Sequence, residues 1–130
     1  MKGDFVTSVS PDEKHLLFGR GDIFMLPLEG EKKPVPYLQT KFIERDAVFS
    51  PDGRCEAYHS DESGRSELHI QGFPERRGKW QVSAEGGIFS QWQVDGKELY
   101  WTGTDGRSVM AAPIELQDAG VKAGRPELAS

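Results

Sequence analysis

The chain has little cysteine and no long apolar segment. Its single cysteine, Cys55, excludes an internal disulfide. The longest apolar runs, such as Val109–Ala112, fall far short of the roughly 20 residues that a membrane helix needs. The N-terminus has no apolar stretch of the kind that secretory signals carry. We therefore expect no membrane partner and a cytoplasmic location, or a periplasmic or extracytoplasmic one if the chain is a fragment of a larger protein.

The chain also has fewer positively than negatively charged residues. The 16 Lys and Arg residues are outnumbered by 21 Asp and Glu, for a net charge of −5. This balance argues against nucleic acid as a partner. A content of 36% hydrophobic and 28% charged residues is typical of a folded chain. We expect one domain that covers residues 1–130.

A unit of about 40 residues occurs three times, and it indicates the fold class. Each copy begins with an apolar residue, continues through a turn that contains Asp, and then reaches a basic residue. The copies begin at Val9, Phe49 and Trp92, which are 40 and 43 residues apart. A second apolar segment, a turn-rich stretch, a third apolar segment and a closing segment follow in each copy.

Each unit predicts four short β-strands. The apolar segments are about 3–6 residues long, too short for amphipathic helices, and rich in aromatic and β-branched residues. Four strands in a period of about 40 residues are typical of a β-propeller blade. We expect an all-β chain of three four-stranded blades at residues 4–40, 41–84 and 85–130. Their closing strands are predicted at Pro36–Leu38, Trp80–Val82 and Pro126–Leu128.

Aromatic residues at matching positions predict the core between the blades. One set lies on the second strand of each unit and another on the innermost strand. The first set is Phe18, Tyr58 and Trp101, and the second is Val9, Phe49 and Trp92.

Asp-Gly pairs mark tight turns. They stand at 52–53, 95–96 and 105–106, and Gly accepts a positive φ angle without steric cost. In the first unit Glu13 replaces this Gly, which predicts a turn of another type or a mildly strained one. The Asp that precedes it recurs once per blade, as Asp12, Asp52 and Asp95. We interpret it as an acceptor of backbone hydrogen bonds and not as a cation site.

Three blades do not close a ring, because propellers typically contain four to eight. We expect the first and the last blade each to expose an apolar face of a size that monomers rarely tolerate. Two chains related by a two-fold axis supply six blades, with the third blade of each meeting the first blade of the other. The prediction is a homodimer that completes a six-bladed ring, and the alternative is that missing chain completes it.

The repeats resemble those of TolB-like β-propellers. The resemblance rests on Phe49–Arg54, which Ala57 and Tyr58 follow, and on Asp95–Trp101. The region from Phe49 to Ile114 is especially similar to propellers attached to bacterial receptor-type Ser/Thr kinases, and related repeats occur in prolyl-oligopeptidase-type peptidases. Glu13 and Val94 depart from the repeat, and both lie on turns. The resemblance implies a scaffold used for interaction or sensing, and it specifies no ligand. The segments that carry the kinase likeness are Gly72–Pro74, Gly78–Ser83 and Met110–Ile114.

The sequence offers no motif for catalysis or for metal binding. It contains neither Gly-x-Ser-x-Gly nor His-x-x-x-His. His15, His59 and His69 occupy different positions in their units, and Cys55 aligns with a strand start as a small buried residue would. The segments at 61–64 and 105–106 lack the spacing of a calcium loop. We expect no enzyme, no metal and no cofactor.

One basic-aromatic cluster is present. It consists of Arg76, Arg77 and Lys79 beside Trp80. Such clusters bind nucleic acid in basic proteins. In this acidic chain we interpret it as a solvated loop that leads into a packed aromatic residue.

Ligand specificity is expected where the three units differ, in the loops that lead into the innermost strands. These loops are Glu44–Asp46 in the second unit and Phe89–Gln91 in the third. As a ligand site at the channel mouth we choose Arg45, Asp46 and Gln91.

The predicted function is a non-catalytic module that binds or scaffolds a protein or peptide, because a rigid ring presents many loops that vary independently of the blades. One alternative is a hydrolase or lyase that uses carboxylates at the channel mouth, recognised by clustered Asp, Glu and His with perturbed pKa values. The others are a sensor-domain fragment of a receptor-type Ser/Thr kinase and a structural remnant without a ligand.

Overall fold

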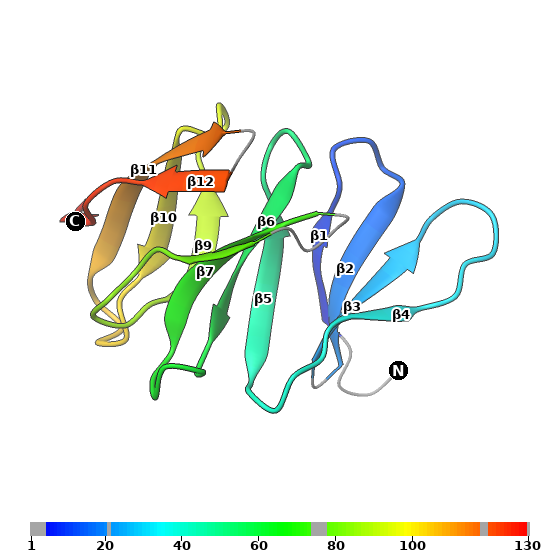
Figure 1. Ribbon diagram of the computed structural model, residues 1–130, viewed down its shortest axis with the longest axis horizontal. Coiled ribbons are helices and arrows are strands. Elements are labelled where there is room, and N and C mark those ends of the chain that lie inside the picture. The colour runs from blue at the N-terminus through cyan, green and yellow to red at the C-terminus, as the bar shows by residue number, and fades with distance from the viewer. Residues whose placement is uncertain (1–4, 21, 74–77, 118–119, 130) are drawn as a thin grey trace.

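The structure, a computed structural model, describes residues 5–20, 22–73, 78–117 and 120–129. In these ranges the chain forms β-strands and no helix, which confirms the all-β class. No helix long and apolar enough to cross a bilayer is found among them. Figure 1 shows three antiparallel sheets that stand side by side in chain order.

The first two sheets each have four strands in sequence order. Short, turn-bounded segments rich in aromatic and β-branched residues form them, as the repeat predicts. The first sheet contains β1 (Phe5–Val9), β2 (His15–Arg20), β3 (Asp22–Pro27) and β4 (Val35–Leu38). The second contains β5 (Glu44–Phe49), β6 (Cys55–Ser60), β7 (Glu67–Gly72) and β8 (Lys79–Gln81).

The third sheet has four strands in the order β12-β11-β10-β9, and a further strand, β13, also pairs with β11. The predicted closing strand is therefore present as β13, beside Met110 and Ala111. A longer β11 pairs its second half with β12, and this extension has no counterpart in the other two units. The bounds are β9 (Ile88–Trp92), β10 (Glu98–Thr102), β11 (Val109–Gln117), β12 (Gly120–Ala123) and β13 (Glu127–Leu128).

The sheets are arranged as propeller blades, with β5 in contact with both β1 and β9, the first strands of the neighbouring sheets. One apolar core lies between the first and second blades and another between the second and third. Every residue of β6 and β7 is buried, because the second blade has a neighbour on each face.

The aromatic register predicted these cores in part. Tyr58, Trp101 and Phe49 are buried in them, and Trp92 packs against one. Phe18 is buried but belongs to neither core, because it lies on the side of the first blade that faces away from the second. Val9 is 46% exposed, which contradicts its assignment to the core. The physical reason is position: Val9 lies on the first blade, which has no blade before it in this chain.

The tight turns repeat one geometry in all three blades. The N–H groups of Glu13, Gly53 and Gly96 each donate to a carbonyl three residues earlier, at 2.9, 2.9 and 2.8 Å. Their φ angles are 61°, 73° and 75°. A turn of another type at Glu13 is therefore wrong, and the strained alternative is confirmed, since a Cβ disfavours this left-handed region.

Candidate functional site

The innermost strands of all three blades carry β-bulges at matching positions, and in β1 the register shifts between Val6 and Ser8. In β5 the register shifts between Arg45 and Val48, and Asp46 has a φ of 57°. In β9 a similar shift falls opposite Trp101, and Phe89 has a φ of 52°. Bulges of this kind redirect side chains, and non-glycine residues at positive φ persist only where the surroundings hold them. Asp46 and Phe89 are thus the two strained positions of the channel-lining strands.

Asp46 is held by a histidine of the next strand. Its Oδ2 lies 2.7 Å from Nε2 of His59, which belongs to β6. The other ring nitrogen, Nδ1, lies 2.9 Å from Oγ of Ser66. Ser66 in turn donates its hydroxyl proton to the carbonyl of Gly87, at 2.9 Å. The chain of contacts joins β5 and β6 to the segment that enters the third blade.

The direction of these hydrogen bonds limits their chemistry. A carbonyl only accepts, so the Ser66 hydroxyl is used as a donor to Gly87 and accepts from His59. Nε2 lies at hydrogen-bond distance from Asp46, so both ring nitrogens of His59 have a partner within the chain. The network is built to position Asp46 and the strand entrance.

A cavity of about 420 Å³ opens beside these residues. Phe5 and Phe89 contribute apolar walls and are 67% and 58% exposed. The ring of Phe89 also packs edge-on against His59, with centroids 5.8 Å apart. Residues of β1, β5 and β9, together with β2 and β3, meet there, and the full lining is Phe5, Thr7, Gly19, Asp22, Glu44, Arg45, Asp46 and Phe89.

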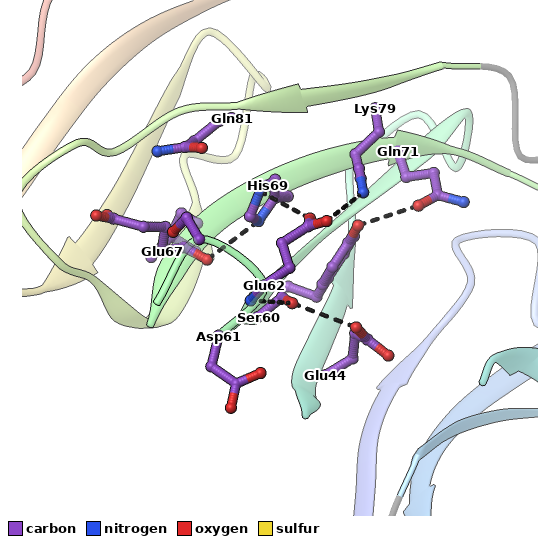
Figure 2. Close-up of polar contacts among 12 residues, drawn as sticks. Glu44, Ser60, Asp61, Glu62, Glu67, His69, Gln71, Lys79 and Gln81 are labelled. Carbon is purple, nitrogen blue, oxygen red and sulfur yellow. Dashed lines mark hydrogen bonds and ion pairs between the residues drawn. The ribbon is translucent and has the colours of Figure 1, made fainter. Parts of the chain in front are cut away.

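Glu44 is a buried carboxylate at the edge of this cavity. Thr40 donates its hydroxyl to both carboxylate oxygens, at 2.9 and 2.8 Å. Ser60 donates to Oε2 at 3.2 Å, a contact that Figure 2 shows. Because its oxygens are satisfied within the chain, Glu44 fixes the entrance of β5 and is not presented to a ligand.

The structure brings two of the three residues chosen from the sequence to one cavity. Arg45 and Asp46 line the cavity together. Gln91 lies on β9 opposite Tyr100, is exposed, and does not belong to the lining. Phe5, His59 and Phe89 are the functional neighbours that sequence reasoning missed. Phe89 stands where the second unit has Asp46, and this change of residue type between units was the available signal.

A second polar cluster lies on the second blade (Figure 2). The Nε2 of His69 is 3.1 Å from Glu62, whose other oxygen is 2.7 Å from Nζ of Lys79. The Nδ1 of His69 lies 3.2 Å from the carbonyl of Glu67, to which it donates. Burial lowers the pKa of His69, and the nearby Glu62 opposes that effect. The cluster fastens the turn after β6 and the strand β8 onto β7, which is a structural role.

The recurring Asp residues act within their turns, as predicted. Asp12, Asp52 and Asp95 each accept the backbone N–H two residues later, at 3.0, 3.0 and 2.9 Å. A hydrogen bond from Ser10 lowers the pKa of Asp12. Asp105 does the same in the β10–β11 turn, where the Ser108 hydroxyl lowers its pKa to about 2. No three Asp, Glu, His or Cys side chains gather as a metal site in the ranges described above.

The remaining sequence candidates have structural surroundings. Cys55 is buried, and burial raises the pKa of its thiol to about 12, so the thiolate needed for reactivity does not form near neutral pH. His15 packs edge-on against Phe73, with centroids 5.3 Å apart. Arg76 and Arg77 of the basic-aromatic cluster lie outside the described residues.

Solved structures with similar folds were found by comparison. The putative TolB from Agrobacterium tumefaciens superimposes with a TM-score of 0.73 at 17% identity, over 98% of this chain and 52% of that one. TolB from Acinetobacter baumannii gives a TM-score of 0.75 at 19% identity, over 100% of this chain and 33% of that one. The Cps50 (Swd1) β-propeller domain of Myceliophteria thermophila gives 0.60 at 10% identity, over 93% and 58%.

These matches define the fold as a β-propeller. More narrowly, it is a TolB-like propeller, as the repeats indicated. The chain spans about half of the Agrobacterium chain and a third of the Acinetobacter chain. No family model and no curated protein matches the sequence.

Proposed function

We propose that the chain is a non-catalytic binding module that takes a peptide segment in the cavity at the channel mouth. The observation that carries this proposal is the pair of strained bulges at Asp46 and Phe89, which flank one cavity. The TolB and Swd1 propeller folds support a scaffold of this kind, because their loops vary without disturbing the blades.

The lining suits a peptide. Its volume of about 420 Å³ falls within the range typical of ligand sites. Phe5 and Phe89 supply exposed aromatic surface of the kind that dominates binding energy at interfaces. Arg45 and Asp22 add charges of opposite sign at the rim, which favour partners that carry both polar backbone and charged side chains.

Catalysis by channel-mouth carboxylates has less support. Asp, Glu and His do cluster there, as that alternative requires. However, both nitrogens of His59 and both oxygens of Glu44 are engaged within the chain. A general base needs a free acceptor within reach of a substrate proton. The sensor-domain alternative rests on the sequence resemblance to kinase-attached propellers.

A phage-displayed library of random peptides tests the binding proposal. Enriched peptides are synthesised, and their dissociation constants are measured by fluorescence anisotropy. Phe89→Ala is expected to raise the dissociation constant by about tenfold or more, since buried aromatic anchors contribute about 2 kcal/mol. Val35→Ala, on the outermost strand β4, is the matched control and leaves it unchanged. Failure to enrich any peptide, or peptides insensitive to Phe89→Ala, would contradict the proposal.

A further inference from the structure

The first blade presents an apolar outer face. Cross-strand pairing places Val6, Phe18 and Phe24 on the same side of the sheet. Leu17 and Ile23 point to the other side, into the core shared with the second blade. The Phe18 and Phe24 rings stack with centroids 5.6 Å apart. The outer face therefore consists of packed aromatic surface. The second blade covers the inner face, but no element of the described chain covers the outer face in the same way.

A cation lies on this face. The Arg20 guanidinium carbon is 5.1 Å from the centroid of Phe18 and 5.6 Å from that of Phe24. Such stacking holds the planar guanidinium against the rings. The first blade thus carries a guanidinium over its aromatic layer, with Asp22 at the paired position on β3.

The third blade presents an outer face of different character. Leu99 and Trp101 pack toward the second blade, so Glu98 and Tyr100 point away from it. The expected apolar face is present on the first blade, and on the third blade the apolar Ala111 and Pro113 share the face with Glu98 and Tyr100. Glu98 accepts a hydrogen bond from the Tyr100 hydroxyl at 2.9 Å, and this bond raises the pKa of Tyr100.

The outer face of the third blade is also hollowed. A cavity of about 470 Å³ lies there, with acidic and apolar walls. Its lining is Glu98, Tyr100, Ala111, Pro113, Arg125, Glu127, Leu128 and Ala129. Two carboxylates, Glu98 and Glu127, and one guanidinium, Arg125, belong to this lining, which leaves it one negative charge in excess.

The tight turns add a second pattern of complementarity. A Cβ on Gly53 would lie 3.2 Å from Cδ of Pro11, and one on Gly96 would lie 3.6 Å from Cδ of Pro51. The Pro of each turn therefore packs against the Gly of the matching turn in the next blade. At the third turn Val94 stands in the place of Pro and is 92% exposed. The first turn offers Glu13 in the place of Gly, with the same backbone φ.

We propose that a second copy of this chain covers both outer faces, with the third blade of each copy packed on the first blade of the other. Arg20 of one copy then faces Glu98 and Glu127 of the second, and Val94 lies beside Glu13. The contact occurs twice about a two-fold axis and closes the assembly. This chain spans 52% of the Agrobacterium propeller, so two copies supply the length of that chain.

The second copy also completes the channel-mouth site. In one copy the cavity is lined by residues of β1, β2, β3, β5 and β9 only, with no residue of β6, β7 or β10. The innermost strands of the second copy supply the remaining wall.

Light scattering coupled to size-exclusion chromatography tests the proposal without any ligand, so its result is independent of the peptide-binding test. At micromolar concentration the expected mass is twice 14.5 kDa. Arg20→Glu or Glu98→Arg alone is expected to raise the dimer dissociation constant by about tenfold or more, and the Arg20→Glu/Glu98→Arg double variant restores it, because close charge pairs at interfaces couple strongly. Lys41→Glu, which reverses a charge on the connection between the first two blades, is the matched control and leaves the constant unchanged.

A second measurement guards against variants that fold poorly. In a Cys55→Ala background, Glu13→Cys/Val94→Cys is treated with a short bismaleimide. The expected product is a covalent dimer without larger species, and either cysteine alone gives none. A folded monomer of 14.5 kDa at micromolar concentration, a ladder of higher oligomers, or no crosslinking would each overturn the proposal.

Discussion

Among the residues that the structure describes, three with a Cβ adopt positive φ, and they do so for two different reasons. Glu13 occupies a turn whose geometry the repeat imposes, with Gly at the matching positions of the other blades. Asp46 and Phe89 occupy bulges at the entrance of the innermost strands, beside a cavity. Strain that the repeat explains belongs to the fold. Asp46 and Phe89 stand at matching positions of the repeat but differ in residue type, and both line the cavity of the candidate site.

Substitutions at the turn separate strain from function. Glu13→Gly is expected to increase the free energy of unfolding by about 1 kcal/mol, because Gly adopts this φ without a Cβ clash. Gly53→Ala is expected to decrease it by about 1–2 kcal/mol, since it combines the same strain with a Cβ close to Pro11. Urea denaturation monitored by circular dichroism measures both.

Glu13→Gly and Gly53→Ala are expected to change the free energy of unfolding in opposite directions, so each serves as a control for the other. If Glu13→Gly destabilises the chain, a side-chain contact of Glu13 outweighs the backbone strain, and the interpretation of the turn fails. Equal effects of the two substitutions would show that the two turns do not share one geometry.

At the scale of elements, a buried carboxylate ties the second blade to the third. Glu67 on β7 accepts hydrogen bonds from the Ser83 hydroxyl at 2.5 Å and from the Gly86 N–H at 2.9 Å. Arg65 lies 2.9 Å away and has a side chain 56% exposed, whereas that of Glu67 is 3% exposed. The carboxylate therefore fixes the connection that leads into β9.

Glu67→Gln tests this tie. It is expected to lower the free energy of unfolding by about 2–3 kcal/mol. A glutamine amide has one oxygen that accepts and one NH2 group that donates, so the buried NH2 group would face the N–H or O–H groups that donate to Glu67. Lys33→Ala is the control, and its expected cost is about 0.5 kcal/mol, since the ion pair of Lys33 with Glu31 is exposed on both sides and such pairs contribute little. Chemical denaturation measures both values. Equal costs for the two variants would contradict the assignment of the tie to Glu67.

The strands were predictable from sequence, and the site was only partly so. Turn residues and aromatic positions recur in every unit, so three copies of one pattern supported each strand. The β11–β12 extension was missed because it occurs once. The contact of His59 with Asp46 was not predictable because it depends on a bulge, which shifts register without leaving a motif. Gln91 and Phe89 lie on the same strand, but only Phe89 lines the cavity.

At the scale of the molecule, the second blade differs from its neighbours because it is packed on both faces. Its strands β6 and β7 are buried throughout and contribute to both cores. The first and third blades each share one core. In an assembly where each repeat contacts only its neighbours, stability is roughly the sum of the repeats and their interfaces. Local unfolding of the central blade therefore breaks two interfaces and costs more free energy than unfolding of an end blade.

Hydrogen exchange followed by mass spectrometry resolves this hierarchy. At concentrations low enough to separate the two copies, peptides that cover β6 and β7 are expected to exchange slowest. Those that cover β2 and β10 should exchange at least about tenfold faster, because local opening costs less free energy where fewer contacts break. At micromolar concentration the second copy covers the outer faces, and protection of β2 rises toward that of β6. Protection of β2 that stays equal to that of β6 at every concentration would contradict the unequal packing, and protection that never changes would contradict closure by a second copy.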